Sequence, residues 1–120
     1  MTNEQRAEAL IQELGFDFDT ISKAYIAELL QNEIDHYQKG SSEYIRLLCG
    51  YLFCIGDRSD IPLMKRAKYG ISMDVGCMID FDWLSSLEND GTEDALTLSR
   101  DELIEDFIRY YKGFQASDLE

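Results

Sequence analysis

The stretch from residue 43 to residue 69 constrains the fold of this chain more than any other part of the sequence. A nearly continuous apolar block, from Tyr44 to Ile55, predicts a helix that is apolar almost all round. Such a helix lies at the centre of a protein and is covered on more than one side. Only Glu43 and Arg46 are expected to face water near its start. A second helical pattern begins at Ile61-Pro62, and a short polar turn joins the two, which predicts an antiparallel helical hairpin.

The turn inside this hairpin carries its own signals. We expect Gly56 to adopt a left-handed backbone conformation and to end the first helix, because glycine has no Cβ that would clash there. Ser59 or Asp60 can accept hydrogen bonds from the free N–H groups at the start of the second helix. Pro62, the single proline of the chain, suits a first helical turn, where its missing N–H costs nothing.

The rest of the chain also has the pattern of short helices separated by glycine. Apolar residues at helical spacing predict helices over residues 4–14, 21–39, 81–87 and 99–112, with Asp19 or Thr20 and the Ser99–Glu102 pair as N-terminal caps. We interpret residues 70–79 as a connector with an extended or short helical piece, and residues 92–98 as one more helical turn.

These patterns together predict an all-α fold. We expect a single helical domain over residues 1–120, with a frayed tail at residues 114–120. About six helices in antiparallel hairpins would form a compact bundle or a short HEAT-like stack.

Charge limits the class of partner. The chain has 24 acidic and 11 basic residues, a net charge of −13, and residues 71–120 alone carry 13 acids against three bases. Such a field repels nucleic acid and anionic membranes and attracts basic proteins. The alternative is that the acidic surface only keeps the protein in solution.

Other features indicate the compartment. The N-terminus is polar and lacks the regions of a signal peptide, and no apolar run approaches the roughly 18 residues of a membrane helix. Three cysteines without metal-type spacing, Cys49, Cys54 and Cys77, indicate reduced and mostly buried thiols. We therefore expect a cytoplasmic protein without a cofactor.

Catalytic and metal-binding patterns are weak. His36 is the only histidine, whereas structural zinc needs about four nitrogen or sulfur ligands, so we expect His36 on the surface. The acid pairs Asp17/Asp19 and Asp80/Asp82 lack the glycine and the distal glutamate of a calcium loop, which favours helix capping. Paired carboxylates can carry acid–base chemistry. A small metal-dependent hydrolase therefore stays open as the least favoured alternative.

One group of residues resembles a known family. The arrangement G-D-x-x-D at residues 56–60, A-K at residues 67–68 and D-x-G-x-x-I-D at residues 74–80 is similar to that of small acidic helical bacterial immunity proteins of polymorphic toxin and contact-dependent growth inhibition systems. The similarity covers residues 55–84. It implies a toxin-binding protein in which the glycine and aspartates shape the two connections and Lys68 pairs with an aspartate.

The leading functional hypothesis is a non-enzymatic acidic binding protein, in particular an immunity protein that occludes the active site of a cognate toxin such as a nuclease. Clustered carboxylates would act as a phosphate mimic in a basic cleft, and buried aromatic anchors would add affinity. The alternative from another class is an accessory or scaffold subunit in which a partner covers the apolar helix 43–55. The residues predicted to contact the partner are Asp90, Glu93, Asp94, Asp101, Glu102, Glu105, Asp106, Trp83 and Tyr110.

Overall fold

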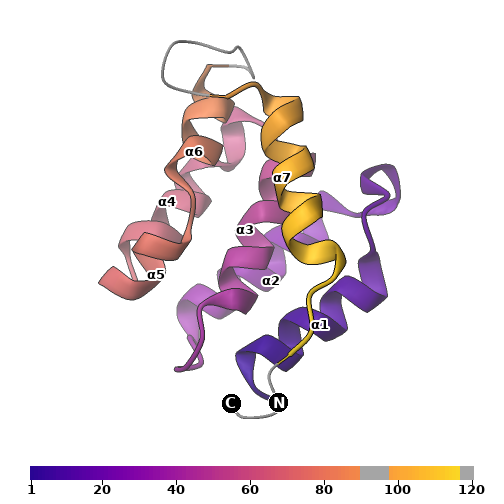
Figure 1. The fold of residues 1–120 in the computed structure, drawn as a ribbon. Coiled ribbons are helices and arrows are strands. Elements are labelled where there is room, and N and C mark those ends of the chain that lie inside the picture. Colours follow the sequence, from indigo (N-terminus) through magenta and orange to yellow (C-terminus); the bar gives the residue numbers. More distant parts are fainter. Residues whose placement is uncertain (90–97, 117–120) are drawn as a thin grey trace.

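The computed structural model describes residues 1–89 and 98–116, and within them the fold is all-α, as predicted (Figure 1). Residues 92–97 of the predicted helical turn and residues 117–120 of the predicted tail lie outside these ranges. The described residues contain no strand. Their helices are α1 Asn3–Leu14, α2 Lys23–Asp35, α3 Glu43–Ile55, α4 Ile61–Tyr69, α5 Met73–Met78, α6 Phe81–Glu88 and α7 Arg100–Lys112, with short 3-10 turns η1 at Phe18–Thr20 and η2 at Arg58–Asp60. The described start of the tail is held on α1, because the Ala116 N–H donates to Glu8 Oε2 at 3.0 Å.

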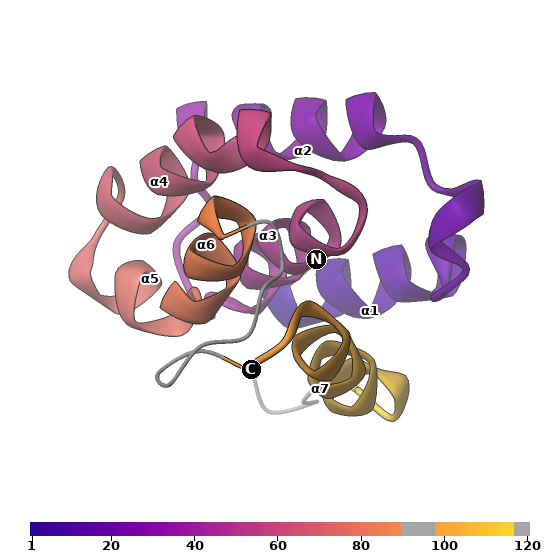
Figure 2. The same cartoon turned by 90° about the horizontal axis from the view of Figure 1, so that it is seen from above.

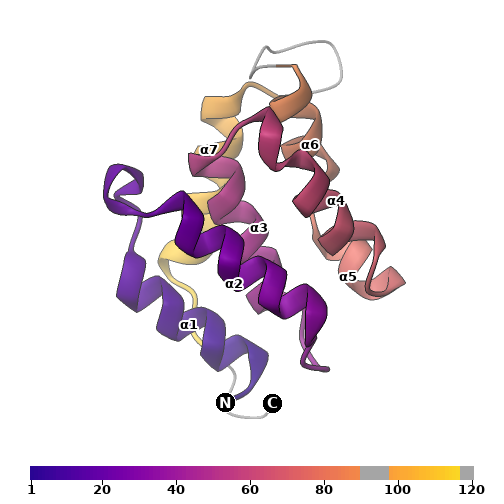
Figure 3. The ribbon, with the colours of Figure 1, turned by 180° about the vertical axis from the view of Figure 1, so that it is seen from behind.

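Helix α3 is the centre of the molecule, as its composition predicted. Ten of its 13 residues are buried, and α1, α2, α4, α5 and α6 all pack against it. Figure 2 shows these helices and α7 arranged around α3, and Figures 1 and 3 place α2 and α7 on opposite sides of it. The arrangement is therefore a compact bundle, in which the chain's own helices bury most of the apolar surface of α3.

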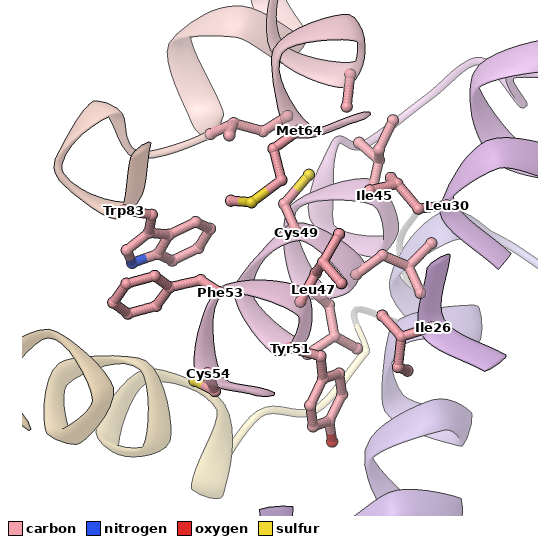
Figure 4. Close-up of a cluster of buried hydrophobic side chains, with 14 of the residues drawn as sticks. Ile26, Leu30, Ile45, Leu47, Cys49, Tyr51, Phe53, Cys54, Met64 and Trp83 are labelled. Atoms are coloured by element: carbon pink, nitrogen blue, oxygen red, sulfur yellow. The ribbon is translucent and has the colours of Figure 1, made fainter. Parts of the chain in front are cut away.

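The core brings side chains from several helices onto α3 (Figure 4). Ile26 and Leu30 reach it from α2, and Met64 reaches it from α4. Trp83 comes from α6 and stacks on Phe53, with ring centroids 6.0 Å apart and an angle of 11° between the planes. All five side chains are buried, so the central helix is held by apolar contacts on more than one side.

The turn after α3 corrects the prediction for Gly56. Its φ angle is −97°, so it is not left-handed. A Cβ at Gly56 would instead crowd the Asp60 carboxylate and the Leu52 carbonyl. Asp60 is buried, accepts a hydrogen bond from the Asp57 N–H at 2.8 Å and pairs with Lys23 of α2 at 2.9 Å. The glycine is needed for this close approach. The turn forms the separate element η2, which Asp57 caps, and Asp60 stands at the N-cap position of α4 without the predicted side-chain hydrogen bond.

Helix α2 differs from its predicted bounds at both ends. Helix α2 begins after Ser22, whose Oγ accepts a hydrogen bond from the Tyr25 N–H, because η1 occupies the residues predicted to cap it. It ends at Asp35 rather than near residue 39, because Asn3 Nδ2 donates to the carbonyls of Gln38 and Ser41 and ties the following segment to α1.

The predicted connector at residues 70–79 contains helix α5. Ser72 caps it by accepting a hydrogen bond from the Val75 N–H at 3.2 Å. A Cβ at Gly76 would crowd the Lys68 carbonyl of α4. This glycine weakened the helical pattern in the sequence, yet its lack of a side chain is what lets α5 pack closely against the end of α4.

The Phe107 side chain of α7 reaches α3 at Gly50. A Cβ at this position would overlap the ring of Phe107 and would lie 3.1 Å from the ring of Trp83. Both rings are buried. The missing side chain therefore makes the space in which α7 docks on the bundle.

The first prediction concerns this contact. Gly50→Ala should lower the free energy of unfolding by about 1–3 kcal/mol, because overpacking outweighs the gain in helix propensity of up to about 1 kcal/mol. Chemical denaturation followed by circular dichroism measures the difference. Gly113→Ala is the matched control, since nothing lies within 4 Å of a Cβ there and its φ angle is −108°. A Gly50→Ala protein as stable as wild type would contradict the close approach.

Candidate functional site

Helix α7 presents the described part of the predicted acidic surface. Ser99 caps it by accepting a hydrogen bond from the Glu102 N–H at 3.3 Å, which is the Ser99 half of the predicted capping box. Leu103, Phe107 and Tyr111 recur at helical spacing and are buried. Because this side is held by the core, the rest of the helix faces outward in a defined orientation.

Four carboxylates gather on the outward side of α7. Asp101, Glu102, Glu105 and Asp106 are all exposed. Asp106 pairs with Arg109 at 2.9 Å, but both partners lie largely in water, so the pair adds little stability and leaves the face acidic. We call these four residues the acidic face. The other predicted carboxylates, Asp90, Glu93 and Asp94, lie outside the described residues.

The two predicted aromatic anchors lie in different environments. Tyr110 is 47% exposed and follows Asp106 by four residues, so it borders the acidic face. Its hydroxyl donates a hydrogen bond to Glu43 Oε1 at 2.7 Å, which fixes the ring. Burial, and then this carboxylate, raise the pKa of Tyr110. Trp83 is only 2% exposed and is a core side chain, so its indole has no free surface to offer a partner.

Arg46 of α3 lies among three aromatic rings beside Tyr110. Its guanidinium carbon is 4.3 Å from the ring centroid of Tyr110, 5.1 Å from that of Trp83 and 5.3 Å from that of Tyr111. It also donates a hydrogen bond to the Tyr111 hydroxyl at 2.8 Å. The sequence pattern predicted only that Arg46 and Glu43 face water near the start of α3. For Glu43 this prediction is wrong, since Glu43 is only 7% exposed.

Lys68 of α4 makes contacts that also differ from expectation. Its ammonium group donates to the carbonyls of Gly76 and Ile79 at 2.5 and 2.6 Å. These carbonyls lie in and just after α5, so Lys68 satisfies the end of that helix. The resemblance implied a pairing with an aspartate, whereas the bonds found within the described residues go to the backbone.

A groove of about 480 Å³ joins these features on one side of the bundle. Arg46 and Tyr110 line it from α3 and α7, and Lys68 lines it from α4. Its rim carries the exposed apolar side chains of Met78 and Phe81. We call this site the Arg46 groove; its full lining is Arg46, Lys68, Cys77, Met78, Ile79, Asp80, Phe81 and Tyr110.

The predicted acid pairs and the histidine have simple roles. Asp80 caps α6 by accepting a hydrogen bond from the Asp82 N–H at 2.8 Å, as predicted, whereas Asp17 makes no side-chain cap. Asp19 does not cap α2, which starts at Ser22. His36 is exposed at the end of α2.

In residues 1–89 and 98–116, no three His, Cys, Asp or Glu side chains come together in a way that could hold a metal ion. No helix within these ranges combines the length and the apolar character that are needed to cross a bilayer.

Comparisons with known proteins add no relative. No family model, no curated protein and no solved structure matches this chain.

The thiols supply the second prediction. Burial raises the pKa of Cys49 and of Cys54 to about 12, whereas Cys77 is exposed on α5. At pH 8 a pKa of about 12 leaves a thiolate fraction on the order of 10⁻⁴. A thiol reagent should therefore label one cysteine quickly in the native protein and the other two only in denaturant. Cys77→Ser should remove the fast phase, and rapid native labelling of that variant would refute the buried assignments.

Proposed function

We propose that this protein is a non-enzymatic binding protein whose acidic face docks a protein partner with a basic surface. The observation that carries the proposal is the arrangement of α7: four exposed carboxylates stand on the outward side of a helix whose other side is fixed in the core. A rigid helix presents its charges without the entropic cost of ordering a loop. Clustered charge also speeds the encounter with an oppositely charged partner.

A more specific proposal is an immunity protein. The net charge of −13 and the acidic face suit a toxin that acts on nucleic acid, because such a toxin presents a basic cleft that carboxylates can occupy in place of phosphates. The resemblance of residues 55–84 to immunity proteins of contact-dependent growth inhibition systems supports the same class. Neutralisation would then result from occlusion of the toxin's active site.

The third prediction tests the acidic face. Asp101→Lys with Glu105→Lys places two positive charges one helical turn apart on it. With a basic protein toxin that the wild-type chain binds as partner, we expect association to slow by about tenfold at low salt, because exposed charges act mainly on the encounter. The difference should shrink as salt rises, since the Debye length falls to about 8 Å at 0.15 M. Stopped-flow or biosensor kinetics over a salt series measure both effects.

The matched control is Glu28→Lys with Asp35→Lys on α2. Both residues are exposed, the change in net charge is the same, and α2 lies across α3 from α7 (Figures 1 and 3). Asp101→Lys also costs about 0.3–1 kcal/mol at the helix N-terminus, so both variants are measured well below their melting temperatures. Equal association rates for the two variants would mean that the acidic face does not dock the partner and only keeps the protein in solution.

A further inference from the structure

The Arg46 groove contains two cations that make no ion pair within the described residues. Arg46 donates to a tyrosine hydroxyl, and Lys68 donates to two backbone carbonyls. This is unexpected in a chain whose acids outnumber its bases by 24 to 11. The one carboxylate in the lining, Asp80, accepts the N–H of Asp82 at the start of α6. Two positive charges are therefore present in this groove without a carboxylate partner among the residues described.

The surroundings of Arg46 favour a planar anion. Aromatic rings lie against the guanidinium and restrict its motion, and toward the described residues only one of its five N–H groups donates a hydrogen bond. A guanidinium held in this way can bind a carboxylate through two parallel hydrogen bonds. Because the stacked rings have already ordered the side chain, little further entropy is lost on binding.

The rim of the groove favours an apolar neighbour for that anion. Met78 is 41% exposed and Phe81 is 59% exposed, and Tyr110 stands on the other side. A second hollow, which shares Lys68 and Cys77 with the groove, continues the surface to the exposed side chains of Tyr69 and Met73. Aromatic and methionine side chains are enriched at protein interfaces, where they supply contact area and adapt to the partner's shape.

We propose that the Arg46 groove binds a carboxylate of the protein partner, carried on an aspartate or glutamate whose neighbours in the partner are apolar. The net charge of −13 disfavours polyanions such as nucleic acid, so the anion must belong to a partner that is not strongly acidic overall. This inference rests on the proposed function for the identity of the partner: a basic protein whose basic surface meets the acidic face and whose carboxylate enters the groove.

The two sites together form a recognition pattern of opposite charges. Tyr110 borders the acidic face through Asp106 and lines the groove beside Arg46, so one partner can contact both sites at once. A partner that matches only the acidic face leaves Arg46 desolvated and unpaired, which costs binding free energy. The groove would therefore select among basic proteins that α7 alone does not distinguish.

The fourth prediction tests the groove with small probes and needs no partner. The isotope-labelled full chain is titrated with N-acetylphenylalanine and, separately, with N-acetylphenylalanine amide, at about 0.15 M salt to screen the net charge. We expect amide-resonance shifts confined to the residues that line the groove, with the carboxylate bound about tenfold more tightly than the amide. Arg46→Gln should abolish this preference.

Two further variants separate charge from packing. Phe81→Ser should weaken both probes and leave their ratio unchanged, because Phe81 is exposed and contributes only apolar contact. Arg66→Gln is the matched control, since Arg66 is an exposed residue of α4 that bonds to Gln31 of α2, away from the groove. Equal affinity for the two probes, unchanged preference in Arg46→Gln, or equally tight binding of inorganic phosphate would each overturn the inference.

The partner assay keeps this inference distinct from the proposed function. If the probes fail to bind but charge reversal on α7 slows association, the groove inference is wrong and the proposed function stands. If the probes bind as expected and charge reversal has no effect, the acidic face is not the docking surface, although the groove is still a carboxylate site.

Discussion

The ring of Phe107 lies in the space left by Gly50, and the position of α7 depends on this contact. The same ring packs against Tyr51 and Tyr111, with centroids 5.4 and 5.1 Å away, and against Trp83 at 6.2 Å. Phe107 therefore joins α3, α6 and α7 in one aromatic cluster. Rings at these distances attract one another through dispersion and through the alignment of their quadrupoles. Without a residue lacking a side chain at position 50, α7 could not lie this close to α3.

The position of α7 then determines both candidate surfaces. Because Phe107 and Tyr111 face the core, the carboxylates at positions 101, 102, 105 and 106 face solvent. The same docking brings the Tyr111 hydroxyl to Arg46 and the Tyr110 ring over its guanidinium. Tyr110 is held in turn by its hydrogen bond to Glu43. The packing of one apolar helix face thus positions the acidic face and one wall of the groove together.

The apolar pattern predicted the fold class and the central helix, because burial of α3 follows from composition alone. The apolar pattern could not predict why a residue without a side chain is needed at certain positions. Gly50, Gly56 and Gly76 have no left-handed backbone; each is small because a ring, a carboxylate or a carbonyl from another position in the fold lies against it. The contacts of Gly50 and Gly76 come from other helices, which a local sequence window does not contain, and the contact of Gly56 comes from a turn whose shape the pattern did not predict. For the same reason the pattern gave residues 70–79 only as a connector with an extended or short helical piece, and it placed Trp83 at an interface although stacking on Phe53 buries it.

The local charge of the Arg46 groove also could not be predicted from the sequence pattern. Counting residues gives a strongly acidic molecule, and this count led to the acidic face of α7. The sign of the charge in a groove, however, depends on which few side chains the fold brings together there. Arg46 and Lys68 are 22 positions apart in the sequence, and they line the same groove because α4 packs against α3 after the turn at Asp60. Glu43, which the sequence pairs with Arg46 as a solvent-facing residue, is buried and engaged by Tyr110. Glu43 thus bonds to Tyr110 rather than to Arg46, and a chain with a net charge of −13 can still place two cations in one groove.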